Sequence, residues 1–256
     1  CGLFYSDYSS INTCAAPPLA RYMDSVLMPQ NYQNYIAGAW CDGDATIENI
    51  NPSDLTDSIG HYAQASRRQL NDALDAAASA QKQWAKTGLE ARQTILMNIG
   101  NELMARREEL GQLLSREEGK PLAEGMGEIY RAGQFFTYYA AETLRQIGDT
   151  ADSVRAGIEI DVRREPVGVV AIISPWNFPT ATAVWNIAPA LAFGNAVIWK
   201  PANIVPASAV ALAEIIARQD MPAGLFNLVM GPGGAIGQGL VESPAINAIS
   251  FTGSVE

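Results

Sequence analysis

The sequence predicts an α/β fold in which a parallel sheet is flanked by helices, and two observations carry this prediction. Residues 167–173 are nearly all apolar without polar alternation, which is typical of a strand buried on both faces. From residue 166 onward, such strands alternate with short helical segments, which favours βαβ units with right-handed crossovers. Strands are expected at 167–173, 196–200, 226–230 and 247–251, and helices at 181–193, 207–218 and 235–242.

The first part of the chain predicts smaller elements before a helical stretch. Residues 1–28 have no periodicity and are interpreted as an irregular extension. Residues 35–43 indicate a hairpin, and residues 47–52 indicate a strand that ends in a turn. Ser66 with Gln69 three positions later forms a capping box, the signature of a helix start.

Three amphipathic helices are expected before residue 148. One follows the capping box, and a second spans residues 90–118. A third follows Pro121, with Tyr130 and Leu144 on its buried face. Weak alternation in the next segment fits an exposed hairpin. The expected division of the chain is therefore 1–28 (extension), 29–147 (helical and hairpin part), 148–165 (hairpin) and 166–256 (βαβ core).

Composition excludes several classes of partner. The 256 residues carry a net charge of −10, which argues against nucleic acid or an anionic membrane, since both attract clustered Lys and Arg. No apolar run reaches the ~18 residues that would cross a bilayer. The cysteines Cys1, Cys14 and Cys41 match neither a disulfide framework nor a metal site. We therefore expect no metal and a cytoplasmic protein.

Asn177 is the first candidate functional residue. The strand at 167–173 stops at Ser174-Pro175, and Asn177 follows between two aromatic residues before Pro179. In open α/β sheets, ligands bind at the carboxyl ends of the strands. We expect the Asn177 amide to be a hydrogen-bond donor in a dry crevice at this edge.

Three further segments are expected at the same edge of the sheet. Lys200 ends the second strand and can reach phosphate or ribose hydroxyls, although a lysine that merely snorkels at a strand end is an equal alternative. Residues 231–237 (Gly-Pro-Gly-Gly-Ala-Ile-Gly) lie where a phosphate cradle belongs, but they depart from GxGxxG and resemble a plain glycine turn. Residues 250–254 form a small-residue turn, which is often structural only.

The other titratable residues are interpreted as structural. His61 is the single histidine and has no activated Ser or Cys beside it in the sequence. The pairs Glu108-Glu109 and Glu117-Glu118 are interpreted as solvated helix faces.

Four motifs in fixed order carry a resemblance to a known family. Ser-Pro-Trp-Asn-Phe-Pro (174–179), Trp-Lys-Pro-Ala (199–202), the glycine segment 231–237 and Phe-Thr-Gly-Ser (251–254) together resemble the NAD(P)-dependent aldehyde dehydrogenase superfamily. The likeness covers residues 35–256. It implies a Rossmann-like cofactor-binding domain, an aldehyde substrate, and a bridging hairpin at 148–165 that is used in homo-oligomers. Within the superfamily, the sequence is most similar to α-ketoglutaric semialdehyde dehydrogenases, followed by succinate semialdehyde dehydrogenases.

The resemblance also implies roles for single residues. Asn177 would donate a hydrogen bond to the oxyanion of a thiohemiacetal, and Lys200 would bind the adenosine ribose of NAD or NADP. Asn203 stands where strict NAD enzymes often carry a glutamate, so NADP is expected to be tolerated. The remaining cofactor contacts would come from Ile173, Ser174, Pro175, Trp176, Gly233, Gly237, Phe251, Thr252, Gly253 and Ser254.

The nucleophilic cysteine and the general-base glutamate of the family are expected beyond residue 256, in a catalytic domain outside this sequence. Residues 109–112 (Glu-Leu-Gly-Gln) echo the base motif, but they lie upstream and within a helix. Two hypotheses follow. One is the amino-terminal half of an aldehyde dehydrogenase that oxidises a semialdehyde to a carboxylic acid. The other is a non-catalytic NAD(P)-binding fragment. An unrelated sheet with coincidental motifs is a poor third.

Overall fold

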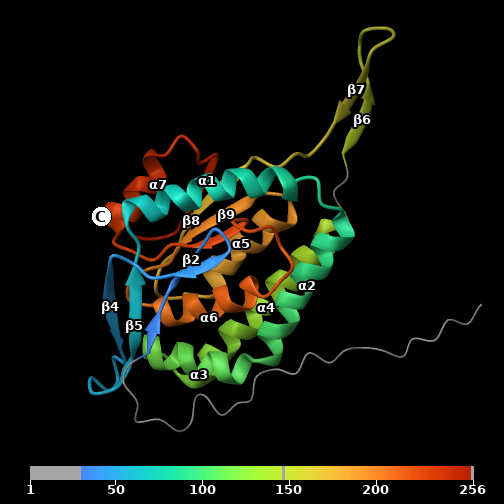
Figure 1. Ribbon diagram of the computed structural model, residues 1–256. Coiled ribbons are helices and arrows are strands. Elements are labelled where there is room, and N and C mark those ends of the chain that lie inside the picture. Colours follow the sequence, from blue (N-terminus) through green and yellow to red (C-terminus); the bar gives the residue numbers. More distant parts are fainter. Residues whose placement is uncertain (1–29, 146–147, 255–256) are drawn as a thin grey trace, which may run out of the picture.

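A six-stranded sheet forms the centre of the computed structural model, which describes residues 30–145 and 148–254 (Figure 1). The strand order is β11-β8-β9-β10-β2-β3. The extension predicted at 1–28 lies outside the described residues. Four strands are parallel, at or near their predicted positions: β8 (Val169–Ile173), β9 (Ala196–Lys200), β10 (Phe226–Leu228) and β11 (Ala248–Phe251).

The amino-terminal hairpin completes this sheet. Strand β2 (Asn34–Ile36) pairs antiparallel with β10, and β3 (Ala39–Cys41) pairs antiparallel with β2. Two fully buried asparagines reinforce the junction: Ala37 N donates to Asn227 Oδ1 at 2.9 Å, and Met230 N donates to Asn34 Oδ1 at 2.7 Å. The predicted parallel sheet is therefore confirmed, with an antiparallel edge added by residues from the start of the described chain.

Helices cover both faces of the sheet. Helices α5 (Ala181–Ala192) and α6 (Pro206–Ala217) pack on one face, while α1 (Arg67–Trp84) crosses the other with α7 (Gln238–Glu242) beside it (Figure 1). The capping box at the start of α1 is confirmed: Gln69 N donates to Ser66 Oγ at 3.2 Å, and Ser66 N donates to Gln69 Oε1 at 3.0 Å. None of the helices within the described ranges is long and apolar enough to cross a lipid bilayer.

A second helical layer packs on α5 and α6. It consists of α2 (Leu89–Ala105), α3 (Arg107–Glu118) and α4 (Leu122–Thr143). The single helix predicted over 90–118 is wrong, because the chain leaves helical geometry at Arg106 (φ −97°, ψ 16°). The sequence has no Pro or Gly to signal this break, and both α2 and α3 pack against α4 on either side of it.

Two residues of the helical layer and one segment of the βαβ part differ from the prediction. Tyr130 and Leu144 were expected to be buried but are exposed, Tyr130 beneath the guanidinium of Arg107 and Leu144 at the end of α4. The helix predicted from residue 235 instead begins with a π-helical turn over Gly233–Gly237, and α7 follows it.

Two small sheets flank the core. One contains β1 (Asn31–Tyr32), β5 (Ser58–Gln64) and β4 (Ala45–Ile50) in that order. Strand β5, which carries the half-buried His61, was not predicted. The other is the hairpin expected within 148–165. Its strands β6 (Asp149–Asp152) and β7 (Glu159–Val162) are exposed throughout and project from the body (Figure 1).

Candidate functional site

The sheet has a topological switch point between β8 and β11. From β8 the chain passes through α5 to β9 and through α6 to β10 on one side, whereas α7 returns it to β11 on the other side. Such a switch point is where open α/β sheets bind ligands, at the carboxyl ends of the strands. The loops after β8 and β11 meet there, since Thr252 N donates to Ile173 O at 3.0 Å.

The loop after β8 is hydrogen-bonded to the end of β9 at the same edge. Ser174 N donates to Lys200 O at 3.2 Å, and Trp199 Nε1 donates to Ser174 Oγ at 2.8 Å. Ser174 and Lys200 are each only 5% exposed. The structure therefore brings together residues from three of the predicted site segments: 174–179, 199–202 and 250–254.

Lys200 is a buried cation. Its Nζ donates to Pro201 O at 2.9 Å, and no carboxylate within the described residues forms an ion pair with it. Burial lowers the pKa of Lys200 to about 8 because the charged amine loses its water. A snorkelling lysine keeps its ammonium in solvent, so this burial disfavours the structural alternative.

The glycine turn lies against Lys200. A Cβ at Gly237 would stand 3.7 Å from Lys200 Cδ, whereas Gly233 and Gly234 face open space. Asn203 adds an unsatisfied group, because its Oδ1 is buried without a hydrogen-bond partner among the described residues. An unpaired cation, an orphaned carbonyl and an open glycine turn fit a ligand that carries phosphates and hydroxyls, as a dinucleotide does.

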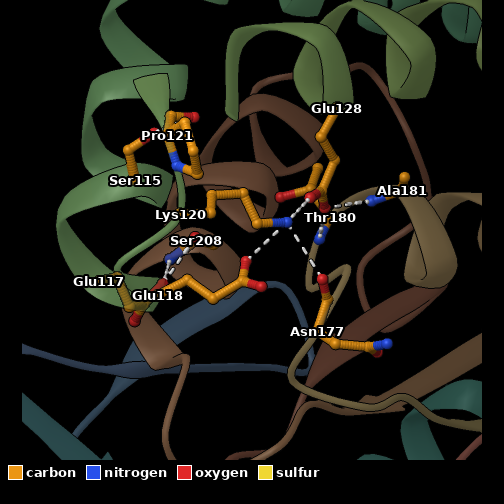
Figure 2. Close-up of polar contacts among 10 residues, drawn as sticks. All are labelled: Ser115, Glu117, Glu118, Lys120, Pro121, Glu128, Asn177, Thr180, Ala181 and Ser208. Atoms are coloured by element: carbon orange, nitrogen blue, oxygen red, sulfur yellow. Dashed lines mark hydrogen bonds and ion pairs between the residues drawn. The ribbon is translucent and has the colours of Figure 1, made fainter. Parts of the chain in front are cut away.

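Asn177 lies next to the switch point but not in a dry crevice, so that expectation is wrong for the described chain. Asn177 is exposed, as are its neighbours Trp176 (54%) and Phe178 (51%). The ammonium of Lys120 lies over one side of the Phe178 ring, 4.4 Å from its centroid, and about half of the ring stays exposed. Among the described residues, the Asn177 side-chain amide has no hydrogen bond, and its backbone oxygen accepts one from Lys120 Nζ at 3.0 Å (Figure 2).

Sequence reasoning missed a buried ion pair beside this loop. Glu128 of α4 accepts hydrogen bonds from Thr180 N at 2.9 Å and Ala181 N at 3.0 Å, the first amides of α5. Lys120 Nζ lies 2.8 Å from Glu128 Oε2 and 2.9 Å from Glu118 Oε2. Burial opposes the charge of Lys120, but its bonds to both carboxylates outweigh burial and raise its pKa.

The interpretation of Glu117 and Glu118 as a solvated face is wrong. Glu117 is buried and accepts hydrogen bonds from Ala207 N, from Ser208 N and Oγ, and from Asn49 Nδ2. Burial raises the pKa of Glu117 to about 7 despite these four donors. The reason for the burial is that α3 ends against the amino terminus of α6, so its last turn faces protein rather than water.

Other predicted site residues lie further out along the edge. Ile173 and Pro175 are half-buried, Thr252, Gly253 and Ser254 are exposed, and Phe251 is 61% exposed. Cys41 is the only cysteine within the described residues, and burial raises the pKa of its thiol, the opposite of an activated nucleophile. No cluster of three or more His, Cys, Asp or Glu side chains in the described ranges could hold a metal ion.

The strand order, the switch point and the strand–glycine turn–helix segment together define a Rossmann-like α/β protein of the nucleotide-binding type. A family model described as "Aldehyde dehydrogenase family" matches residues 40–256. The chain belongs to the aldehyde dehydrogenase family.

Curated relatives share this likeness along most of the chain. An α-ketoglutaric semialdehyde dehydrogenase of Bacillus subtilis is 40% identical over 237 residues, which are 90% of this chain and 48% of that protein. An NADP(+) succinate-semialdehyde dehydrogenase of Escherichia coli is 40% identical over 235 residues, 91% of this chain and 48% of that protein. The chain thus spans about half the length of the curated relatives it matches.

Solved structures of related enzymes match the fold of this chain. An aldehyde dehydrogenase from Brucella melitensis matches with a TM-score of 0.85 at 36% identity, over 87% of this chain and 46% of that one. An NADP-dependent enzyme from E. coli matches with a TM-score of 0.84 at 38% identity, over 86% of this chain and 46% of that one. A betaine aldehyde dehydrogenase from Staphylococcus aureus in complex with NAD+ has a TM-score of 0.83 at 29% identity, over 86% of this chain and 45% of that one.

Proposed function

We propose that this chain supplies the cofactor-binding half of an NAD(P)-dependent aldehyde dehydrogenase that oxidises a semialdehyde to a carboxylic acid. One observation carries the proposal: the loop of Asn177 and the buried Lys200 end neighbouring strands at the switch point and are hydrogen-bonded through Ser174. Relatives that act on α-ketoglutaric and succinate semialdehydes support the substrate class.

Lys200 and Asn203 would hold the adenosine ribose, and the turn over 233–237 would lie along the adenine and pyrophosphate. The cofactor would supply the hydride acceptor. Asn177 would donate its amide hydrogen to the oxyanion that forms when a thiolate attacks the aldehyde carbon. A preorganised donor of this kind is worth about 3 kcal/mol in the transition state. The thiolate and the general base would come from outside residues 1–256.

Cofactor binding by the 256-residue chain is the first experiment. Trp176 is half exposed beside the switch point, so its fluorescence should be quenched when NADPH or NADH binds. We expect saturable quenching with both cofactors, and a Lys200→Met variant that binds at least tenfold more weakly. Exposed Lys82→Met should bind as the unaltered chain does. Absence of saturable quenching by either cofactor at millimolar concentration would overturn the proposal.

A second candidate function concerns the chain by itself: a non-catalytic nucleotide-binding protein. The observation that favours it is the place of Cys41, the only described thiol: it lies on β3, the edge strand at the far end of the sheet from the switch point between β8 and β11. The discriminating assay adds succinate semialdehyde and NADP+ to the 256-residue chain and follows NADPH at 340 nm. If the chain binds the cofactor tightly but forms no NADPH, the result supports this candidate. Steady formation of NADPH would instead place the nucleophile within these residues.

We propose that the segment 148–165 makes contacts between copies of the protein. Strands β6 and β7 are exposed at all their positions and project from the body, and Ile158, Ile160 and Val162 present apolar surface there. Light scattering of a variant with Ile160→Asp and Val162→Asp tests this. A smaller assembly than that of the unaltered chain is expected, and an unchanged mass would contradict the proposal.

A further inference from the structure

We propose that Lys120 is a positioning residue for Asn177: its ammonium fixes the Asn177 carbonyl and thereby the backbone from which the side-chain amide extends. This inference rests on the proposed function, in which Asn177 is the oxyanion donor. The sequence alone assigned no role to Lys120, which follows the end of α3 and lies 57 positions before Asn177.

The surroundings of Lys120 form a built site rather than a surface contact. Its side chain is 9% exposed, and its Nζ faces three acceptors: Glu118 Oε2, Glu128 Oε2 and Asn177 O (Figure 2). The ammonium also lies 4.4 Å from the ring centroid of Phe178, a cation–π contact. Gly119, with φ of 79°, ends α3 in the left-handed conformation and turns the chain toward this position.

Glu128 extends the same anchor to the other end of the loop. Its side chain is fully buried, and while Oε2 binds Lys120, Oε1 accepts from Thr180 N and Ala181 N. One ion pair therefore holds both ends of residues 177–181, since Lys120 binds the start of the segment and Glu128 binds its end (Figure 2). Burying two charges is costly, and these directed bonds offset the cost.

The Asn177 side chain depends on this anchor. It is exposed and makes no hydrogen bond with any described residue, and Figure 2 shows it running away from Lys120 while its carbonyl faces the ammonium. Lys120 therefore acts on the backbone, which sets the Cα–Cβ direction from which the Asn177 amide extends. An oxyanion donor stabilises charge only when it is preorganised, and a misplacement of about 1 Å can cost up to ~100-fold in rate.

Hydrogen exchange in the full 256-residue chain tests the anchor without any activity. Lys120→Met keeps most of the stem and removes the ammonium, so we expect amides of residues 174–184 to exchange at least tenfold faster. Lys120→Arg should restore most of the protection, because a guanidinium can still donate to Asn177 O. Arg145→Met, which breaks the exposed pair with Glu142, is the control and should leave this segment unchanged.

Lys120→Met leaves two buried carboxylates without their cation, so the variant can be globally destabilised. The triple variant Lys120→Met/Glu118→Gln/Glu128→Gln removes the cation and both carboxylate charges and keeps an acceptor for Thr180 N and Ala181 N. Faster exchange confined to 174–184 in this triple variant is expected. Exchange at the unaltered rate in a folded variant overturns the proposal.

Kinetics in a longer chain that carries this sequence and oxidises an aldehyde gives the second test. Asn177→Ala should lower kcat by ~10²- to 10³-fold and Lys120→Met by ~10- to 100-fold, with the KM for cofactor unchanged. The variant Asn177→Ala/Lys120→Met should be no slower than Asn177→Ala alone. Losses that multiply would mean that Lys120 acts independently of Asn177. Failure of cofactor binding would instead refute the proposed function. Hydrogen exchange would still show whether Lys120 holds the loop of Asn177 in place.

Discussion

Glu117 Oε2 accepts two hydrogen bonds from Ser208, 91 positions later, from the backbone nitrogen at 2.9 Å and from the hydroxyl at 2.6 Å. Glu128 likewise accepts from the first amides of α5. Thus α3 and α4 each place a buried carboxylate at the amino terminus of a helix that follows a strand of the candidate site. A carboxylate there satisfies free amides and its charge complements the helix dipole. At Glu117 the cost of burial exceeds these gains, so its pKa is raised.

Glu117→Gln should destabilise the fold by about 2–3 kcal/mol. Both Glu117 oxygens accept from donors, so the amide NH2 of glutamine would face an N–H or O–H group and leave it unpaired. Urea unfolding measures the difference. Glu108→Gln, exposed on the same helix, is the matched control and should stay within about 0.5 kcal/mol of the unaltered chain. A Glu117→Gln variant as stable as this control would contradict the prediction.

The same carboxyl should give stability a pH dependence. The folded pKa of Glu117 is about 7, above its usual 4.5, so the folded state holds a proton that the unfolded state has released. This contribution is fully present below about pH 4.5 and is lost as the pH rises through about 7. Unfolding free energies measured from pH 5 to 8 should therefore fall more for the unaltered chain than for Glu117→Gln. Parallel curves would exclude Glu117 as the titrating group.

Binding of NADPH should weaken above pH 8. The pKa of Lys200 is lowered to about 8 by burial, so free Lys200 loses its charge as the pH rises through this value. If the ammonium contacts the ribose and its phosphate, the dissociation constant should rise up to tenfold per unit above pH 8, and more for NADPH than for NADH. Fluorescence titrations at pH 7, 8 and 9 measure this. Lys200→Met should show a flat profile, and an equal slope in both proteins would rule out Lys200.

Asn203→Glu should shift cofactor preference toward NAD. The Asn203 amide carries no charge, so nothing at this position repels a 2′-phosphate, whereas a glutamate would repel it and accept from ribose hydroxyls. We expect the ratio of the dissociation constants for NADPH and NADH to rise at least tenfold. Asn203→Gln keeps a neutral amide and serves as the control. A tenfold preference for NADH in the unaltered chain would contradict the idea that Asn203 allows NADPH to bind.

Much of the sheet could be predicted because its signals are local. Strand β9 lies at its predicted residues, and β8 lies within its predicted range, since unbroken apolar runs mark strands that are buried on both faces. The break at Arg106 carries no such signal. It has no Pro or Gly, and only the packing of α2 and α3 on α4 reveals it.

The candidate site could be predicted only where it lies on strand ends. Lys200 is the last residue of β9 and Asn177 lies in the loop that follows β8, so their place at the sheet edge follows from topology. Glu117, Lys120 and Glu128 lie on or beside surface-like helical sequence, and their burial depends on contacts 52 to 91 positions away. The exposure of Asn177 was also out of reach, because no local pattern tells which segment covers a loop.

The pairing of β2 with β10 also sets an order of events during synthesis. The hydrogen bond between Met230 N and Asn34 Oδ1 joins residues 196 positions apart, and the one between Ala37 N and Asn227 Oδ1 joins residues 190 positions apart. At about 5–20 residues per second, a ribosome needs on the order of ten seconds or more to make the intervening chain. During that time β2 has been synthesised but β10 has not, so the hairpin cannot form its pairing with the sheet. Such late, distant pairing is slow to form, so this edge is where a nascent chain most needs protection by a chaperone.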